Sequence, residues 1–216
     1  MKTLAVLMPT YQRPHHLAWI AENLRQMTPE SLYQLYFIIE PHDEESIRTA
    51  QAIEDPCVSV LIINAGSSNR ALNMGCALTF EPYIYNACDD LEFTPGWAER
   101  MLKVFKEEPT ARVVSSWDGF CVNGKSGYML DRNYVQQFGT IDEPGKIMHE
   151  YHHYYADEEL MRTAMHRKVF HASEVPVLHH HPALSSKYSR DATYERAEST
   201  YSDDAKTYET RRHLFT

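Results

Sequence analysis

In the segment YNACDDLEF, residues 85–93, three acidic side chains follow an apolar run. Residues 82–87 have the character of a short buried strand, and they run directly into the carboxylates of Asp89, Asp90 and Glu92. Adjacent like charges repel, and a buried carboxylate without a partner is unstable, so acids at the end of a buried strand favour a cation-binding site. A solvated turn is the alternative that these residues leave open.

Three strand-like segments precede this cluster, and each is followed by a helix-like one. The expected strands are apolar runs typical of strands buried on both faces of a sheet. They cover residues 3–8, 35–40 and 58–64. The expected helices are marked by apolar spacing, capping residues or a closing Pro. They cover residues 14–27, a segment from residue 43, and residues 70–78. This alternation predicts an α/β fold with a mostly parallel sheet covered by helices on both faces, whose ligands bind beyond the carboxyl ends of the strands.

The second half of the sequence alternates less regularly. Pro95 opens a helix, and residues 113–117 and 127–130 have the composition of further strands. From residue 183 onward the chain is polar and rich in Tyr, Ser, Asp, Arg and Glu, which predicts a peripheral helical tail. We expect one domain over residues 1–182 and a C-terminal helical extension, residues 183–216, packed on it.

Composition excludes several classes of protein. Of 216 residues, 43% are hydrophobic, which is enough for a core and too many for a disordered chain. The apolar runs are far shorter than the roughly 20 residues of a membrane helix, and the N-terminus has the pattern of a strand and not of a secretion signal. These features predict a cytoplasmic protein with no membrane span. A net charge of -9 disfavours binding of nucleic acid by phosphate neutralisation alone, although a local basic groove stays possible. The cysteines are widely spaced and predicted to be free thiols: Cys57, Cys76, Cys88 and Cys121.

Two further groups of residues could carry chemistry. Asp157, Glu158 and Glu159 open a predicted helix, where acids complement the helix dipole without any catalytic purpose. His179 and His181 flank another histidine on an extended segment, so their side chains point to one face. An imidazole there could complete a metal site begun by Asp90.

The order of these segments resembles that of the family-2 glycosyltransferases of the GT-A fold, which transfer a sugar from a nucleotide-diphosphate donor. The resemblance extends over about residues 3–182 and implies a Rossmann-like sheet. The motifs that carry it are, in order, LAVLMPTYQRP, IIEPHDE, AGSSNRALNMGCALT, IYNACDDLEFTPGW, YYADEELMRTAM and LHHHP.

The resemblance also implies roles for particular residues. Asp90 would bind Mn²⁺ or Mg²⁺ together with His179 or His181, although Cys88 stands where many relatives have the first aspartate of the metal motif. Asp157, or failing it Glu158, would be the catalytic base. Nine residues would contact the donor: Pro9, Thr10, Tyr11, Arg13, Glu40, Asn69, Arg70, Asn73 and Asp89.

The resemblance therefore predicts a metal-dependent inverting glycosyltransferase that uses a nucleotide-sugar donor, with a UDP-sugar as the first choice. The acceptor could be a glycan, a protein or a modified nucleic acid, and the same chemistry on a hydroxylated base of DNA is one alternative. A nucleotidyltransferase is another, but the glycine-rich phosphate loop expected after its first strand is replaced here by PTYQRP. A non-catalytic carbohydrate-binding module is the third. The sequence predicts no oligomeric state.

Overall fold

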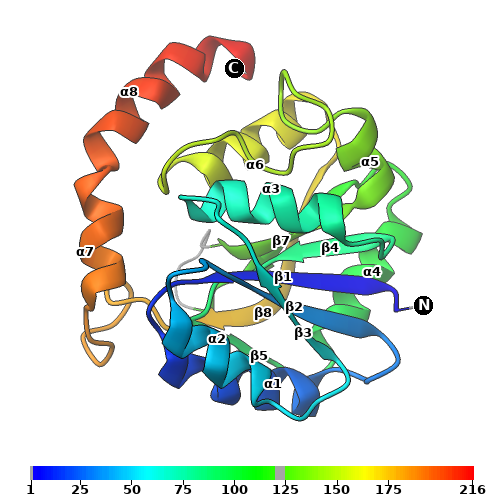
Figure 1. Cartoon of the computed structure of the whole chain (residues 1–216). Helices are drawn as coiled ribbons and strands as arrows, with labels where there is room; N and C mark the ends of the chain where they lie inside the picture. The colour runs from blue at the N-terminus through cyan, green and yellow to red at the C-terminus, as the bar shows by residue number, and fades with distance from the viewer. Residues whose placement is uncertain (1, 120–124) are drawn as a thin grey trace.

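The computed structural model describes residues 2–119 and 125–216, and Figure 1 shows a central sheet with helices on both of its faces. Cys57, Cys76 and Cys88 are free thiols, as predicted. Cys121 lies outside the described residues. In the described part of the chain, no helix combines the length and the apolar composition needed to cross a bilayer.

The strands follow the spatial order β3-β2-β1-β4-β7-β6-β8-β5. Their bounds are β1 Leu4–Thr10, β2 Tyr33–Ile39, β3 Val58–Ile62, β4 Tyr83–Asn86, β5 Leu91–Phe93, β6 Val113–Trp117, β7 Lys125–Asp131 and β8 Phe170–His179. The first four strands in this order pair in parallel. Beyond them β7 is antiparallel to both of its neighbours, and β8 is parallel to β6 and antiparallel to β5. The predicted α/β fold is confirmed, with the continuous parallel part in the first half of the chain.

The helices fall at the predicted places in the first half of the chain. Their bounds are α1 Pro14–Met27, α2 Glu44–Gln51, α3 Ser68–Leu78, α4 Trp97–Glu107, α5 Arg132–Gln137, α6 Ala156–His166, α7 Ala192–Ser199 and α8 Tyr201–Arg211. A 3-10 turn, Arg212–Leu214, follows α8. Local signals explain the helix starts: Asp43 accepts the backbone N–H of Ser46 at the start of α2, and Ser67 accepts that of Arg70 at the start of α3.

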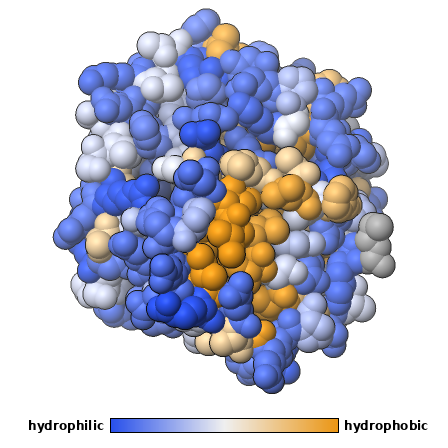
Figure 2. Space-filling model, in the orientation of Figure 1, coloured by the Kyte–Doolittle hydropathy of each residue, from blue (hydrophilic) through white to orange (hydrophobic). Residues whose placement is uncertain are grey.

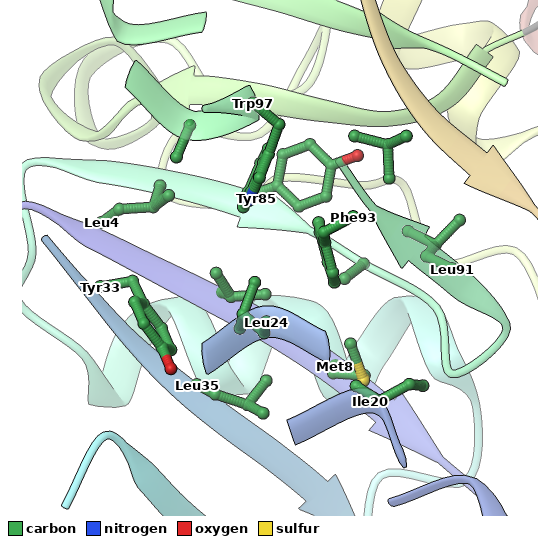
Figure 3. Close-up of a cluster of buried hydrophobic side chains, with 14 of the residues drawn as sticks. Leu4, Met8, Ile20, Leu24, Tyr33, Leu35, Tyr85, Leu91, Phe93 and Trp97 are labelled. Atoms are coloured by element: carbon green, nitrogen blue, oxygen red, sulfur yellow. The ribbon is translucent and has the colours of Figure 1, made fainter. Parts of the chain in front are cut away.

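Two hydrophobic clusters lie on opposite faces of the sheet. Alternate side chains of β1 point to opposite sides, so that Leu4 and Met8 belong to one cluster while Leu7 belongs to the other. The first cluster packs β1 and β4 against α1 and α4, with Tyr85 and Trp97 at its centre (Figure 3). The second packs the other face against α3, α5, α6 and the end of the tail. This two-sided burial holds the carboxyl ends of β1 and β4 in register at one edge of the molecule.

Strand β3 forms one edge of the sheet and is not fully covered. Figure 2 shows an apolar area in the middle of the face on which β3 and α3 lie. On this face β3 exposes the side chain of Ile62, and α3 exposes those of Met74 and Leu78. Phe80, two residues after the end of α3, is also exposed.

The tail follows the side of the molecule at which the parallel strands end (Figure 1). Asp204 on α8 is buried and accepts the backbone N–H groups of His152, His153 and Tyr154, each at 2.8 Å. Arg211 forms an ion pair with Glu159 of α6 at 2.8 Å. These contacts fasten α8 to α6 and to the segment that precedes it.

Candidate active site

The loop after β1 and the acidic cluster after β4 are joined by one buried arginine. Arg13 Nη1 lies 2.6 Å from Asp89 Oδ1, and Thr10 Oγ1 donates to the other oxygen of Asp89 at 2.7 Å. On its far side, Arg13 donates to both carboxylate oxygens of Asp191, at 2.8 and 3.0 Å. The side chains of Arg13 and Asp89 are only 4% and 6% exposed, so this charge pairing takes place away from bulk water.

The turn that positions Arg13 is itself fixed by a backbone contact. Gln12 has a positive φ of 54°, which is uncommon for a residue with a side chain. Its N–H donates to Asp43 Oδ2 at 2.6 Å, so the acid that caps α2 also holds this turn.

Strand β5, which the sequence analysis missed, brings the late histidines to the acids. It pairs with β8 so that Leu91 lies opposite His179, and the N–H of His180 donates to the carbonyl of Asp90 at 2.8 Å. His179 Nε2 consequently lies 3.2 Å from Asp90 Oδ1. Cys88 Sγ is 3.8 Å from the same imidazole nitrogen.

Asp90 is buried, and its two carboxylate oxygens have different surroundings. Oδ2 accepts the hydroxyl of Tyr194 at 2.7 Å. Among the described residues, no donor meets Oδ1 with hydrogen-bond geometry, although His179 Nε2 is near it. A buried carboxylate oxygen without a donor is costly, so Oδ1 is suited to a cation.

The pKa values follow from burial and from these contacts. Burial raises the pKa of Asp90, but its interactions with His179 and the Tyr194 hydroxyl outweigh burial and lower that pKa overall. Burial lowers the pKa of His179, while Asp90, Asp118 and Asp157 raise it by more. Asp90 is therefore ionised at neutral pH, as a metal ligand must be, and a metal ion that binds His179 Nε2 would displace a proton from that nitrogen.

Asp90, His179 and Cys88 each direct one possible ligand atom to a common point. A carboxylate oxygen and an imidazole nitrogen suit Mn²⁺, and Mg²⁺ prefers oxygen ligands. Burial raises the pKa of the Cys88 thiol, so the sulfur stays protonated and is a poor ligand for either ion. The residues therefore fit a hard or borderline divalent cation held by Asp90 and His179.

A second group of possible ligands, Asp142, Glu143 and His149, lies in the segment before α6. Asp142 already pairs with Arg211 at 2.8 Å, and Glu143 pairs with Lys146 at 2.9 Å. These cations neutralise the acids, so the group is less suited to a metal ion than the one around Asp90.

Among the three acids that open α6, Asp157 interacts electrostatically with His179 and His153. Glu158 accepts from Tyr208 at 3.0 Å and from Arg162 at 2.8 Å, and Glu159 is buried against Tyr151 and Arg211. Asp157 is open to solvent, yet the protein around its carboxyl group raises its pKa by desolvation.

The sequence matches a known family across most of its length. Residues 5–170 match the family described as Glycosyl transferase family 2. The chain belongs to this family. It is therefore a glycosyltransferase, and the predicted resemblance is confirmed. No curated protein sequence matches the chain.

Solved structures share the fold at low sequence identity. Glucosyl-3-phosphoglycerate synthase from Mycobacterium tuberculosis, in complex with Mn²⁺, UDP and glucosyl-3-phosphoglycerate, has a TM-score of 0.64 at 11% identity, over 94% of this chain and 80% of that one. The mannosyltransferase PcManGT from Pyrobaculum calidifontis, in complex with GDP-Man and Mn²⁺, has a TM-score of 0.60 at 13% identity, over 81% and 55%. Another structure of the mycobacterial enzyme holds Mg²⁺ and UDP. These likenesses confirm the GT-A fold.

Six of the nine residues predicted to contact the donor, Asp89 among them, lie at or just after the carboxyl ends of the parallel strands. Pro9 and Thr10 end β1, and Tyr11 and Arg13 follow it. Glu40 follows β2 and accepts the backbone N–H groups of Ala65 and Gly66 through Oε1, while its buried Oε2 has no partner among the described residues.

The three predicted donor-contacting residues on α3 make different contacts. Asn69 donates to the carbonyl of Tyr151, and Asn73 bonds the backbone of residues 147 and 148. Both amides therefore fasten α3 to the segment before α6. Arg70 is exposed and lies 3.7 Å from Glu150. In this arrangement only Arg70 has a side chain free to turn toward a ligand.

His181 lies on the face of the segment predicted for it but outside the ligand group. Its ring is 5.2 Å from that of His179 and 4.8 Å from that of Tyr194. Its Nδ1 accepts the N–H of Ala183 at 3.1 Å. Of the two histidines proposed from the sequence, His179 is the one whose nitrogen reaches Asp90.

The sequence analysis missed the contribution of the tail. Asp191 and Tyr194 contact Arg13 and Asp90, and Tyr194 also lines a cavity of about 560 Å³ beside the acids, together with Trp19 of α1. The one local signal is Asp191 as the cap of α7, where it accepts from the N–H groups of Thr193 and Tyr194. A capping pattern predicts a helix start and says nothing about contacts made 100 or more residues away.

We predict that Arg13→Met lowers the free energy of unfolding at pH 7 by about 3–5 kcal/mol, because it leaves buried carboxylates unpaired. Burial holds the pKa of Asp89 above its usual value even with Arg13 present. Without Arg13 that pKa rises further, the folded state binds more protons than the unfolded one, and the deficit should shrink as the pH falls from about 7 to 5.

Urea unfolding at both pH values measures this effect. Arg70→Met is the control, because Arg70 forms an exposed pair worth less than about 1 kcal/mol. Equal losses for the two variants, or a deficit for Arg13→Met that does not change with pH, would contradict the assignment.

Proposed function

We propose that the chain transfers a sugar from a nucleotide-diphosphate donor, with a UDP-sugar as first choice, to an acceptor hydroxyl, in a metal-dependent reaction that inverts the anomeric carbon. The observation that carries the proposal is the approach of two kinds of group to one imidazole, that of His179. Asp90 and His179 form a cation site there, and Asp157 approaches closely enough for its charge to act on His179. Family membership favours this reaction over the nucleotidyltransferase and carbohydrate-binding alternatives.

The donor would lie across the carboxyl ends of β1, β2 and β4. In an open α/β sheet this edge is where ligands bind. The unpartnered Oε2 of Glu40 is available to a ribose or base at one end, and Asp90 stands at the other. The named complexes of fold relatives with UDP and Mn²⁺ or with GDP-Man and Mn²⁺ support a donor of this class.

Asp90 and His179 would hold a divalent ion, with Mn²⁺ or Mg²⁺ as the candidates. When bound, such an ion supplies charge neutralisation to the oxygens of a departing diphosphate. The chain's own residues keep Asp90 ionised and place its open oxygen beside the imidazole.

Asp157 would act as the general base. As the acceptor oxygen bonds to the anomeric carbon, the bond from that carbon to the diphosphate oxygen breaks, and the acceptor's proton passes to the Asp157 carboxylate. One base and a single displacement, without a covalent intermediate, would invert the anomeric carbon. Glu158 is the weaker candidate, since it is engaged by Tyr208 and Arg162.

The proposal predicts that Asp90→Ala abolishes Mn²⁺-dependent binding of UDP, measured by calorimetry with and without the ion. Glu92→Ala is the matched control, because Glu92 belongs to the same acidic cluster but pairs with His180 at 2.8 Å. Its Mn²⁺-dependent binding should persist. Undiminished binding in Asp90→Ala would remove Asp90 from the site and the donor from this edge.

The raised pKa of Asp157 predicts a pH dependence. The carboxylate is the active form of a base, so kcat/KM should fall about tenfold per pH unit below its pKa, which lies above the ordinary value of about 3.9. Asp157→Asn should lower kcat by at least about 100-fold and abolish this acidic limb. A limb that persists in Asp157→Asn would assign the base to another group.

The stereochemical course is a separate prediction. Proton NMR of the first product formed from a UDP-α-sugar should give the coupling constant of a β-linkage. A product that retains the α configuration would contradict the single-displacement mechanism while leaving the donor class untouched.

A further inference from the structure

Helix α7 contacts the segments that follow β1, β3 and β4, two of which carry predicted donor-contacting residues. The hydroxyl of Thr193 donates to the carbonyl of Tyr11 after β1 at 2.9 Å, and Arg196 lies 4.3 Å over the ring of the same tyrosine. Arg196 also donates to the carbonyl of Gly66 after β3. Tyr194 reaches Asp90 after β4. A segment remote in sequence thus forms one wall of the proposed site.

Tyr194 is held at Asp90 from two sides. The guanidinium carbon of Arg13 lies 4.3 Å from the centre of its ring, and the ring of His181 meets it edge-on at 4.8 Å. Asp191, three residues earlier, accepts hydrogen bonds from Arg13 with both carboxylate oxygens. It also caps the helix on which Tyr194 lies. The phenol therefore has little freedom to choose another partner.

The geometry around Asp90 distinguishes its two oxygens. The hydroxyl of Tyr194 donates to Oδ2, while Oδ1 faces His179 Nε2 without a donor. A carboxylate that is free to rotate about its Cβ–Cγ bond presents either oxygen, and one with an anchored oxygen presents the other in a fixed direction. Partners that orient ligating carboxylates in this way are a general feature of metal sites.

We propose that Tyr194 is a positioning residue of the metal site: its hydroxyl anchors Oδ2 of Asp90 so that Oδ1 is presented, together with His179, to the cation. The C-terminal extension then contributes to metal binding through Asp90, without touching the ion. This inference rests on the proposed function, because it needs the cation to bind at Asp90. It also gives a role to His181, which supports the ring of Tyr194 from a position outside the ligand group.

Binding of Mn²⁺ to the full chain, in the absence of any donor, tests the proposal. Free Mn²⁺ is measured by electron paramagnetic resonance during titration of the parent, Tyr194→Phe and Tyr201→Phe. Tyr194→Phe should weaken Mn²⁺ binding by about 10- to 100-fold, as loss of a partner to a ligating side chain does elsewhere. The expected shift in Kd is independent of catalytic activity.

Tyr201→Phe is the matched control. Its hydroxyl forms a 2.8 Å hydrogen bond with that of Tyr155. Each variant therefore removes one hydrogen-bonded hydroxyl group from the tail. In metal-free buffer both variants should stay folded at the temperature of the titration, although Tyr194→Phe should lose more stability, because it leaves the buried Oδ2 of Asp90 without its donor whereas Tyr201 is exposed. Tyr201→Phe should keep the parent's Mn²⁺ affinity, and the difference between the variants therefore reports positioning and not general weakening of the tail.

The outcomes separate this inference from the proposed function. If the parent binds Mn²⁺, Asp90→Ala does not, and Tyr194→Phe binds as tightly as the parent, the positioning role is wrong while the metal site stands. Tighter Mn²⁺ binding by Tyr194→Phe would also contradict the positioning role. It would show that the hydroxyl competes with the ion for Asp90. Absence of Mn²⁺ binding by the parent, or parent-like binding by Asp90→Ala, would overturn both.

Discussion

The site depends on the neutralisation of two adjacent carboxylates that the fold buries at the end of β4. Asp89 and Asp90 repel each other, and neither has enough water to be stable alone. The fold gives them different partners. Arg13 neutralises Asp89 directly, whereas Asp90 has His179 and the Tyr194 hydroxyl and keeps one oxygen open. Asp89 is thereby paired within the protein, and Asp90 keeps one oxygen without a donor among the described residues.

The partners of these two acids come from segments that are far apart in the sequence. Arg13 comes from the loop after β1, His179 from the end of β8, and Tyr194 from the tail. The other half of the tail contacts α6 and the segment before it, through Asp204 on the backbone before α6 and Arg211 on Glu159. Residues 183–216, which we predicted to pack on residues 1–182 as an extension, thus contact both the acids after β4 and the region around the start of α6.

The strand-and-helix alternation of the first half could be predicted because the spacing of apolar residues within each segment identifies that segment. The acids after β4 could be recognised in the same way, since they directly follow an apolar run. The sequence missed β5, three residues long, because so short a segment has no measurable period. That omission hid the reason for His179, since β5 is what aligns β8 with Asp90. Tyr194 could not be predicted either, because a phenol on a polar helix has no pattern that names a partner 104 residues away. The resemblance implied that Asn69 and Asn73 contact the donor. In the structure their amides form hydrogen bonds with the backbone of the segment before α6.

The central claim is that Asp90 and His179 hold a divalent cation beside a nucleotide diphosphate. Crystals soaked with UDP and Mn²⁺, with anomalous diffraction recorded to locate manganese, test it most directly. The account predicts one strong peak between Asp90 Oδ1 and His179 Nε2, in contact with the diphosphate. A peak at Asp142 and His149 instead, or UDP bound with no metal at Asp90, would contradict it.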